Sequence, residues 1–415
     1  MGYVGLPAAV TFAESGFPVT GFDVIKAKVD RLNSGDSYIE DVTSTRLQGV
    51  VDSGRFHATS NFSNLSDQDV IVIAVPTPLN KTRDPDLTAV KGATQSIAEN
   101  LRPGQLIILE STTYPGTTEE VVKPILEQSG LRAGEDFFLA FSPERIDPSS
   151  KNWHFANVPK VVGGYTPDCL AVAQTFYSQV VEKVIPVSST QVAEMCKIFE
   201  NVFRVVNVAL VNEMTLLCDR MNLNFWEVLD AASTKPYGFM KFTPGPGVGG
   251  HCIPIDPFYL TWKAREHDFN TRFIELAGEI NLQMPHYVRE LVIRALNSQG
   301  KSLNNASILL LGVAYKKDVG DVRESPAVKI VELLHHSKAS LSYHDPFVPV
   351  FEEGHLTMNS VELTADTLAS ADCVVIVTDH SSFDIEFVVN HARMIVDTRN
   401  VTAGIAEQRE KILVL

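Results

Sequence analysis

A cysteine in a glycine-rich segment is the residue best suited to covalent chemistry. The segment GPGVGGHCIPIDPFYL, residues 245–260, surrounds Cys252 with four glycines and then enters an apolar run typical of a helix. Glycine has no Cβ, so its backbone can approach a ligand closely. Asp256 and Pro257 have the residue types of a helix start, which places Cys252 just before a helix N-terminus, where the helix dipole favours a thiolate. We therefore predict that Cys252 is a nucleophile.

The remaining cysteines are expected to be small buried residues, as most free cysteines are. They are Cys169, Cys196, Cys218 and Cys373. A total of five cysteines without a C-x-x-C pair favours a reducing compartment, which fits the cytoplasm. It argues against a disulfide framework and a structural zinc site, so no metal site is predicted.

Polar residues on a long apolar stretch form a second candidate group. Lys197 and Asn201 are four residues apart and share one face of an expected helix, with Glu194 about one turn earlier. A cation and an amide held side by side suit a developing oxyanion, which needs preorganised donors. A solvated stripe is the alternative, but the flanking positions are largely apolar.

Two carboxylates follow a strand-like segment in FSPERIDP, residues 141–148. Glu144 or Asp147 could act as a general base there. Carboxylates in exposed loops are commonly only solvated, and position alone leaves both interpretations open.

The first residues contain the end of a dinucleotide-binding fingerprint. Gly2 and Gly5 take the places of its second and third glycines, and Asp23 ends the next strand. A carboxylate there accepts ribose hydroxyls and repels a 2′-phosphate, which favours NAD over NADP. The polar turns VPTP and ESTTYPGT follow later strands, at the sheet edge where ligands bind. The first glycine of the fingerprint and the strand before it are missing.

The composition is that of a folded protein with more than one domain. The 415 residues are 45% hydrophobic and 20% charged, which suits two or three globular domains. A net charge of −15 disfavours non-specific nucleic-acid binding, although it is compatible with a local basic pocket for phosphate. With no secretory leader and no apolar run near about 20 residues, no membrane association is predicted.

Strand-like and helix-like segments alternate in two parts of the chain, which indicates parallel sheets with helices on both faces. The expected strands are 18–24, 69–76, 105–112, 137–143 and 181–187, then 306–315, 339–346 and 373–379. Long helices are expected over 190–222 and 275–296. We predict an α/β fold with two doubly wound Rossmann-like domains, joined by a long central helix and a helical middle domain. The predicted domains are 1–188, 189–298 and 299–415.

Together these segments resemble the UDP-glucose/GDP-mannose dehydrogenase family, in one order from Gly2 to about Asn400. The matching segments are GYVGLP, VPTP, ESTTYPGTTEE, SPERIDP, KIFENVFRVVNVALVNE, PGPGVGGHCIPIDPFYLTWKARE and GVAYKKDVGDVRESPA. The cysteine segment most resembles the bacterial branch that oxidises UDP-N-acetylglucosamine to a uronate for surface polysaccharides. The resemblance implies a four-electron oxidation of the C6 alcohol that consumes two NAD+. In that scheme Cys252 forms a thiohemiacetal and then a thioester, which water hydrolyses.

The resemblance also implies roles for individual residues. Lys197 and Asn201 would stabilise oxyanions, and Asp256 would support Lys197 and the water network. Thr112 and Glu144 would position or deprotonate water. The implied catalytic residues are Cys252, Lys197, Asn201, Asp256, Glu144 and Thr112. The implied NAD contacts are Gly2, Tyr3, Val4, Gly5, Asp23, Lys28, Pro76, Thr77, Thr112 and Arg323. The implied UDP-sugar contacts are Glu144, Arg145, Lys197, Asn201, Gly249, Lys316 and Arg399.

Two positions depart from the pattern of UDP-glucose dehydrogenases. Ile255 stands where many of them have a lysine, three residues after the nucleophile, and His251 replaces a small residue before it. These differences argue against UDP-glucose, and His251 is given no catalytic role. Oxidation of UDP-N-acetylmannosamine or UDP-glucose is an alternative. A nucleotide-sugar-binding protein impaired in NAD binding is another, as is a two-electron hydroxy-acid dehydrogenase, which needs no cysteine.

Two further expectations concern assembly and the N-terminus. The helix over 190–222 carries apolar residues on more faces than one protomer covers, so a homodimer or higher oligomer is expected. A doubly wound domain without its central first strand would leave neighbouring strand edges unpaired. We therefore expect the native polypeptide to begin upstream, with a Val/Ile-rich strand and a Gly-x-Gly turn. A degraded gene encoding a crippled enzyme is the alternative.

Overall fold

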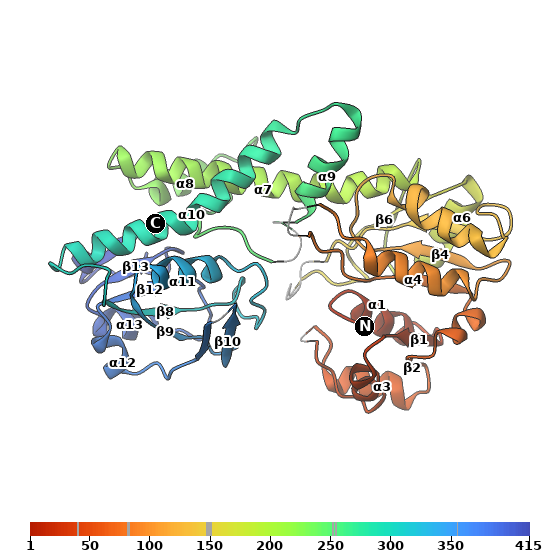
Figure 1. Cartoon of the computed structure of the whole chain (residues 1–415), viewed down its shortest axis with the longest axis horizontal. Helices are drawn as coiled ribbons and strands as arrows, with labels where there is room; N and C mark the ends of the chain where they lie inside the picture. Colours follow the sequence, from red (N-terminus) through yellow and green to blue (C-terminus); the bar gives the residue numbers. More distant parts are fainter. Residues whose placement is uncertain (40, 81–83, 147–151, 251–252, 254, 355) are drawn as a thin grey trace. The chain divides into compact units, whose positions relative to one another are not determined.

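The computed structural model describes residues 1–39, 41–80, 84–146, 152–250, 253, 255–354 and 356–415 (Figure 1). These residues divide into two compact units. The first comprises Met1–Glu200 with Phe258–Phe269, and the second comprises Asn201–Pro257 with Asn270–Leu415. The division into domains 1–188, 189–298 and 299–415 stays a prediction.

The N-terminal part of the first unit is built on a two-stranded parallel sheet, β1 (Val19–Phe22) and β2 (Phe56–Thr59). The helices of this part are α1 (Gly5–Glu14), α2 (Lys26–Asn33) and α3 (Ser44–Asp52). Leu6 and Val10 of α1, Leu32 of α2 and Leu47 of α3 share a buried core with Phe56 of β2. The opposite side of α1 joins a second core, which belongs to the larger sheet of this unit.

That larger sheet has the strand order β3-β4-β5-β6-β7 within the described residues. Its strands are β3 (Val70–Ile73), β4 (Leu106–Leu109), β5 (Phe138–Phe141), β6 (Lys160–Gly164) and β7 (Val184–Val187). The helices between them are η1 (Phe62–Asp67), α4 (Thr88–Ala98), η2 (Thr118–Val122), α5 (Lys123–Leu126), η3 (Glu127–Ser129) and α6 (Pro167–Tyr177). Every residue of β4 is buried, as expected for a strand covered on both faces.

One strand junction differs from the predicted parallel arrangement. β3, β4 and β5 are parallel, but β6 pairs antiparallel with β5. The sequence pattern does not predict β6, because KVVGG is short and ends in two glycines. A Cβ at Gly163 would lie 2.1 Å from the Ser189 carbonyl oxygen, so close backbone packing requires glycine there. The antiparallel pairing brings the start of β6 to the sheet edge where β4 and β5 end.

Helix α7 (Thr190–Arg220) confirms the predicted long helix and contributes residues to both units. By length and composition it could cross a membrane, and no other helix of the described residues meets that criterion. One such helix is weak support for a membrane span, since long core helices of soluble proteins meet the same criterion. α7 also carries polar side chains in buried positions, which are Thr190, Glu194, Lys197, Asn201, Asn212 and Thr215.

Helices follow α7 along the chain. They are α8 (Phe225–Ser233), α9 (Asp256–Ala264), η4 (Arg265–His267) and α10 (Arg272–Asn297). Asp256 and Pro257 belong to the second unit, whereas the rest of α9 and η4 belong to the first. α10 confirms the second predicted long helix and buries one face, including Met284, Val288 and Leu291.

The C-terminal sheet is wholly parallel, with the order β14-β13-β12-β8-β9. Its strands are β8 (Ser307–Leu311), β9 (Ser340–His344), β12 (Cys373–Ile376), β13 (Ile395–Asp397) and β14 (Ile412–Val414), drawn in blue in Figure 1. The remaining elements are α11 (Pro326–His336), an antiparallel pair β10 (Val350–Glu353) and β11 (Leu356–Asn359), α12 (Ala365–Ser370), α13 (Ile385–His391) and η5 (Arg409–Lys411). The strand order reverses between β8 and β12, which is the position of the ligand crevice in open α/β sheets. The second doubly wound domain is therefore confirmed.

Candidate active site

The glycines before the candidate nucleophile pack against Tyr315. Three residues singled out in the sequence lie outside the described residues: Cys252, His251 and Asp147. A Cβ at Gly249 would lie 2.8 Å from Tyr315 Cβ, and one at Gly250 would lie 2.9 Å from the Tyr315 ring. Gly250 also has a φ of +88° and donates its N–H to the Arg323 carbonyl at 3.2 Å. In the structure, these glycines let the loop approach a protein side chain, where the sequence suggested a ligand.

The start of this loop is held by two buried amides. Asn212 Oδ1, on α7, accepts the N–H of Gly245 at 3.0 Å. Asn212 Nδ2 donates to Asn281 Oδ1, on α10, at 2.9 Å. A Cβ at Gly245 would lie 2.9 Å from Arg399 Nη1. The segment that leads to Cys252 is therefore fixed by two helices and flanked by a guanidinium group.

Asp256 and Asn201 form a buried hydrogen bond. Asp256 begins α9, as the Asp-Pro pair predicts, and is 2% exposed. Asn201 Nδ2 donates to Asp256 Oδ2 at 2.5 Å. A hydrogen bond to an ionised acceptor is roughly twice as strong as one between neutral groups. The sequence resemblance links Asp256 to Lys197, and the structure adds this contact with Asn201.

Lys197 is a buried cation on the same helix. It is 9% exposed and lies one turn before Asn201 on α7. No carboxylate in the part of the chain that the structure describes forms an ion pair with it. Because a buried charge is costly without a partner, an oxyanion of a ligand would complete this position.

Glu194 binds the loop that follows β4. Its carboxylate accepts the N–H groups of Gly116 at 2.5 Å and Thr118 at 2.8 Å, and the Thr118 hydroxyl at 2.6 Å. Burial raises the pKa of Glu194 to about 7, although these donors oppose the rise. Glu194 therefore positions the ESTTYPGT segment, which contains the predicted site residue Thr112.

Glu144 belongs to a charge network that the sequence reasoning missed. Glu144 Oε1 accepts the backbone N–H groups of Arg145 and Ile146, both at 2.6 Å. Lys160 Nζ lies 2.7 Å from Glu110 Oε1 and 3.6 Å from Glu144 Oε2. Glu110 directly follows β4, and Lys160 begins β6. A charged residue at the end of a buried strand is the sequence signal that could have identified Glu110, whereas Lys160 has no such signal because β6 is not predicted from the sequence.

The Arg145 side chain is engaged near this network. Its Nη1 donates to the Pro159 carbonyl at 2.7 Å, and its Nη2 pairs with Glu200 Oε1 at 2.7 Å. Contact between Arg145 and a UDP-sugar stays a prediction.

Asp23 lies at the carboxyl end of β1, where it is predicted to hold the NAD ribose. Its Oδ1 accepts the Ile25 N–H at 2.9 Å, and its Oδ2 lies 2.5 Å from the Met1 ammonium. Burial raises the pKa of Asp23, but hydrogen bonds from the Met1 ammonium and the Ile25 N–H outweigh burial and lower it. Lys28 Nζ lies 5.6 Å from the centre of the Tyr38 ring.

The turn from Gly2 to Gly5 leads into α1. The Leu6 N–H donates to the Gly2 carbonyl at 3.0 Å, and Tyr3 is exposed while Val4 is half-buried. This turn gives a helix N-terminus that can face a pyrophosphate, and Asp23 provides a carboxylate for the ribose hydroxyls. These residues fit the adenosine half of NAD.

The turns after β3 and β4 share one sheet edge because these strands are parallel neighbours. Thr77 is buried and Pro76 is exposed, while Thr112 is half-buried after β4. Tyr259 Oη, on α9, donates to the Thr77 carbonyl at 2.9 Å. The VPTP turn, predicted to contact NAD, is therefore anchored to the helix that follows the cysteine loop.

Predicted UDP-sugar contacts lie at the carboxyl edge of the C-terminal sheet. Lys316 follows β8, and Arg399 follows β13. Arg399 Nε donates to the Val377 carbonyl, just past β12, at 2.8 Å. The Arg399 side chain therefore reaches the residue that follows β12, and a cation at the carboxyl edge of this sheet suits a diphosphate. Arg323, predicted to reach the cofactor, pairs with Asp321 at 2.6 Å.

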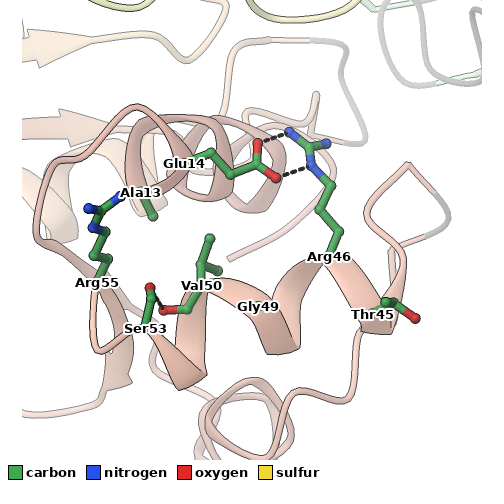
Figure 2. Close-up of a pocket in the computed structure, with 8 residues that line it drawn as sticks. All are labelled: Ala13, Glu14, Thr45, Arg46, Gly49, Val50, Ser53 and Arg55. Carbon is green, nitrogen blue, oxygen red and sulfur yellow. Dashed lines mark hydrogen bonds and ion pairs between the residues drawn. The ribbon is translucent and has the colours of Figure 1, made fainter.

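A hollow of 380 Å³ between α1 and α3 contains none of the predicted site residues (Figure 2). It is lined by Ala13, Glu14, Thr45, Arg46, Gly49, Val50, Ser53 and Arg55. Arg46 pairs with Glu14 through Nε–Oε1 at 2.7 Å and Nη2–Oε2 at 2.6 Å, as Figure 2 shows. No ligand is assigned to this hollow, because Glu14 and Arg46 are already paired with each other.

The four cysteines predicted to be structural are buried or half-buried. Cys169, Cys218 and Cys373 are buried, and Cys196 is partly exposed. Burial raises the pKa of Cys373 to about 12, and burial together with Glu200 raises the pKa of Cys196. The thiols of Cys373 and Cys196 are therefore poor nucleophiles. Among the described residues, no group of three His, Cys, Asp or Glu side chains could hold a metal ion.

Three domain models of one family match the chain in order. Residues 1–181 match the NAD binding domain of the UDP-glucose/GDP-mannose dehydrogenase family, residues 191–283 its central domain, and residues 309–404 its UDP binding domain.

Relatives match over nearly the whole chain. A UDP-N-acetyl-D-mannosamine dehydrogenase from Pyrococcus horikoshii is 36% identical, covering 97% of this chain and 94% of that protein. A UDP-N-acetyl-D-glucosamine 6-dehydrogenase from Pseudomonas aeruginosa is 34% identical, covering 92% and 90%. A solved structure of a UDP-D-ManNAc dehydrogenase from Pyrococcus horikoshii has a TM-score of 0.90 and 34% identity, over 100% of this chain and 96% of that chain.

Proposed function

Because the chain belongs to the UDP-glucose/GDP-mannose dehydrogenase family and is an NAD-dependent nucleotide-sugar dehydrogenase, we propose that it oxidises the C6 alcohol of a UDP-N-acetylhexosamine. The proposed product is the uronate, a precursor for surface polysaccharides. We propose that the enzyme acts in the cytoplasm. The cysteine segment favours UDP-N-acetylglucosamine as substrate. UDP-N-acetylmannosamine is the second candidate, because relatives of similar identity are named for each sugar.

Cys252 is proposed as the nucleophile that retains the aldehyde. NAD+, when bound, accepts a hydride in each of the two oxidations. Between them, the thiolate adds to the C6 aldehyde to give a thiohemiacetal, and after the second oxidation the carbon is held as a thioester. Water then cleaves the carbon–sulfur bond, which returns the thiolate and leaves the uronate.

Lys197 and Asn201 are proposed to bind the oxygen on C6. The buried Lys197 ammonium, which forms no ion pair with the described residues, would stabilise an alkoxide before oxidation and an oxyanion during thioester cleavage. The Asn201 amide, oriented by Asp256 at 2.5 Å, would supply a fixed second donor one helical turn away. This juxtaposition on α7 is the observation that most supports the proposal.

Glu144 and Thr112 are proposed to act on the water. A carboxylate held by two backbone N–H groups has a fixed orientation and can accept a proton from water as it attacks the thioester.

Lys316 and Arg399 are proposed to bind the diphosphate of the UDP-sugar, together with Gly249 and Arg145 near the sugar. Arg323 and Lys28 are proposed as cofactor contacts.

The test is the NADH yield from a panel of UDP-sugars. The proposal expects two NADH for each UDP-N-acetylglucosamine consumed, with a lower kcat/KM for UDP-N-acetylmannosamine and UDP-glucose. A yield of one NADH would instead indicate a two-electron dehydrogenase. Tight UDP-sugar binding without NAD binding in a calorimetric titration would support the impaired binding protein.

We also propose a homodimer or higher oligomer formed through α7. The helix carries large exposed apolar side chains at intervals of three, four or seven residues, which places them along one side. They are Val192, Met195, Phe199, Phe203, Leu210 and Leu217. A second copy of the chain would cover this stripe from water.

A further inference from the structure

Lys160 is a fully enclosed cation between two carboxylates in the first unit. The residue is 4% exposed, and its Nζ lies 2.7 Å from Glu110 Oε1 and 3.6 Å from Glu144 Oε2. The Phe155 ring lies 4.8 Å from Nζ, and the Tyr177 ring lies 5.2 Å from it. The antiparallel β5–β6 junction creates this arrangement, because it brings the first residue of β6 to the ends of β4 and β5.

Two carboxylates, those of Glu110 and Glu144, lie next to the single ammonium group of Lys160. Glu110 is 2% exposed, and its Oε1 also accepts the Tyr177 hydroxyl at 2.6 Å. Burial, followed by the Glu110 charge, raises the pKa of Tyr177, which keeps that hydroxyl a neutral donor. Burial lowers the pKa of Lys160, but the Glu110 and Glu144 carboxylates outweigh burial and raise it. Lys160 therefore stays charged.

The two carboxylates depend on Lys160 to different degrees. Glu144 Oε1 has two backbone donors, whereas Glu110 accepts one hydrogen bond from the described residues, from the Tyr177 hydroxyl, besides its ion pair with Lys160. The second oxygens, Glu110 Oε2 and Glu144 Oε2, are buried without a hydrogen-bond donor among the residues described. Without Lys160, two like charges would face each other out of water, and such a pair takes up a proton.

We propose that Lys160 is a positioning residue that keeps Glu144 in its carboxylate form by neutralising the second buried carboxylate, Glu110. This inference rests on the proposed role of Glu144 as the base for water. Lys160 touches neither substrate nor cofactor in this scheme. Lys160 determines the charge of Glu144, the proposed base. The hydrogen bond from the Tyr177 hydroxyl holds the Glu110 carboxylate in place.

Infrared spectroscopy tests the charge states without turnover. The spectrum of each single variant, E110Q and E144Q, is subtracted from that of the folded wild-type protein at pH 7. Neither difference spectrum is expected to show a carboxylic-acid C=O band, because both glutamates are ionised in the wild type under this proposal. Lys160→Met is expected to add one such band. Lys160→Met/Glu110→Gln is expected to lose it, because Glu144 alone keeps two backbone donors. Three results would each overturn the proposal. The first is a protonated Glu144 in the wild type, and the second is the absence of a new band in a folded Lys160→Met protein. The third is a band that persists in the double variant.

The pH dependence of kcat provides a second readout. In Lys160→Met, the pH at which kcat rises is expected to move upward by roughly one to three units. The reason is that the charge of one carboxylate makes it harder for its neighbour to lose a proton. Lys160→Met/Glu110→Gln is expected to return to the wild-type profile. A purely structural role for Lys160 would change thermal stability and leave the profile in place, which would refute the proposal. The NADH yield of the wild type tests the proposed function separately, since the infrared result does not require activity.

Discussion

Asn201 Nδ2 donates a 2.5 Å hydrogen bond to Asp256 Oδ2, which joins the middle of α7 to the first residue of α9. Both side chains are buried, at 8% and 2% exposure, so water cannot replace the bond. The bond orients the Asn201 amide, and Asp256 lies four residues after Cys252 in the sequence. The proposed oxyanion donor, Asn201, is thereby hydrogen-bonded to the first residue of the helix that follows the proposed nucleophile in the sequence.

Asp256→Asn is expected to lower kcat by about ten- to a hundredfold, because a hydrogen bond to a charged group contributes roughly 1.5–3 kcal/mol. The neutral amide would hold Asn201 less firmly. Steady-state kinetics and an NAD titration check this. Asp168→Asn is the matched control, since Asp168 is an exposed carboxylate in the first turn of α6. Equal losses in both variants would contradict the assigned role.

Cys252→Ser is expected to abolish uronate formation, because a hydroxyl is a much weaker nucleophile than a thiolate at neutral pH. Chromatography of the reaction products checks this. Cys196→Ser is the control, since Cys196 is a half-buried thiol with a raised pKa. Uronate produced by Cys252→Ser at the wild-type rate would exclude the covalent mechanism.

Glu194 is expected to make the stability of the protein depend on pH. Its pKa is raised by burial from 4.5 to about 7 in the folded protein. Between these values the folded state keeps a proton that the unfolded state has lost, so the free energy of unfolding falls as pH rises from about 4.5 to 7. The change is on the order of 3 kcal/mol. Urea unfolding at several pH values should show a smaller decline for Glu194→Gln than for the wild type. Identical declines would show that Glu194 does not titrate in this range.

The stripe of exposed apolar side chains along α7 is expected to be buried between copies of the chain in an oligomer. Light scattering should give a mass at least twice the 45.6 kDa of one chain. Phe199→Asp is expected to reduce that mass, because Phe199 is 65% exposed on this stripe and a charge there opposes burial in an interface. Arg204→Ala, at an exposed polar position of the same helix, should leave the mass unchanged. A wild-type protein found only as a monomer would rule out the interface.

Local patterns along the sequence determined the elements and part of the site. The period of apolar residues predicts α7 and α10, and the Asp-Pro pair predicts that α9 begins at Asp256. Four-residue spacing places Lys197 and Asn201 on one face of α7. These features depend on neighbours within one or two helical turns, and so they can be recognised without knowing the fold.

Only the tertiary structure decided which distant side chains share a charge or a hydrogen bond. Lys160 begins a short strand ending in two glycines, and nothing local relates it to Glu110 or Glu144. The antiparallel pairing of β6 with β5 brings the three together, because it reverses the chain at the edge where the carboxylates lie. Likewise, the glycines before Cys252 look like a ligand-binding loop in sequence, but Gly249 and Gly250 are required by the Tyr315 side chain, 65 or more residues away. Sheet pairing and close packing bring together residues that are far apart in the chain. A pattern of neighbouring residue types therefore cannot predict such contacts.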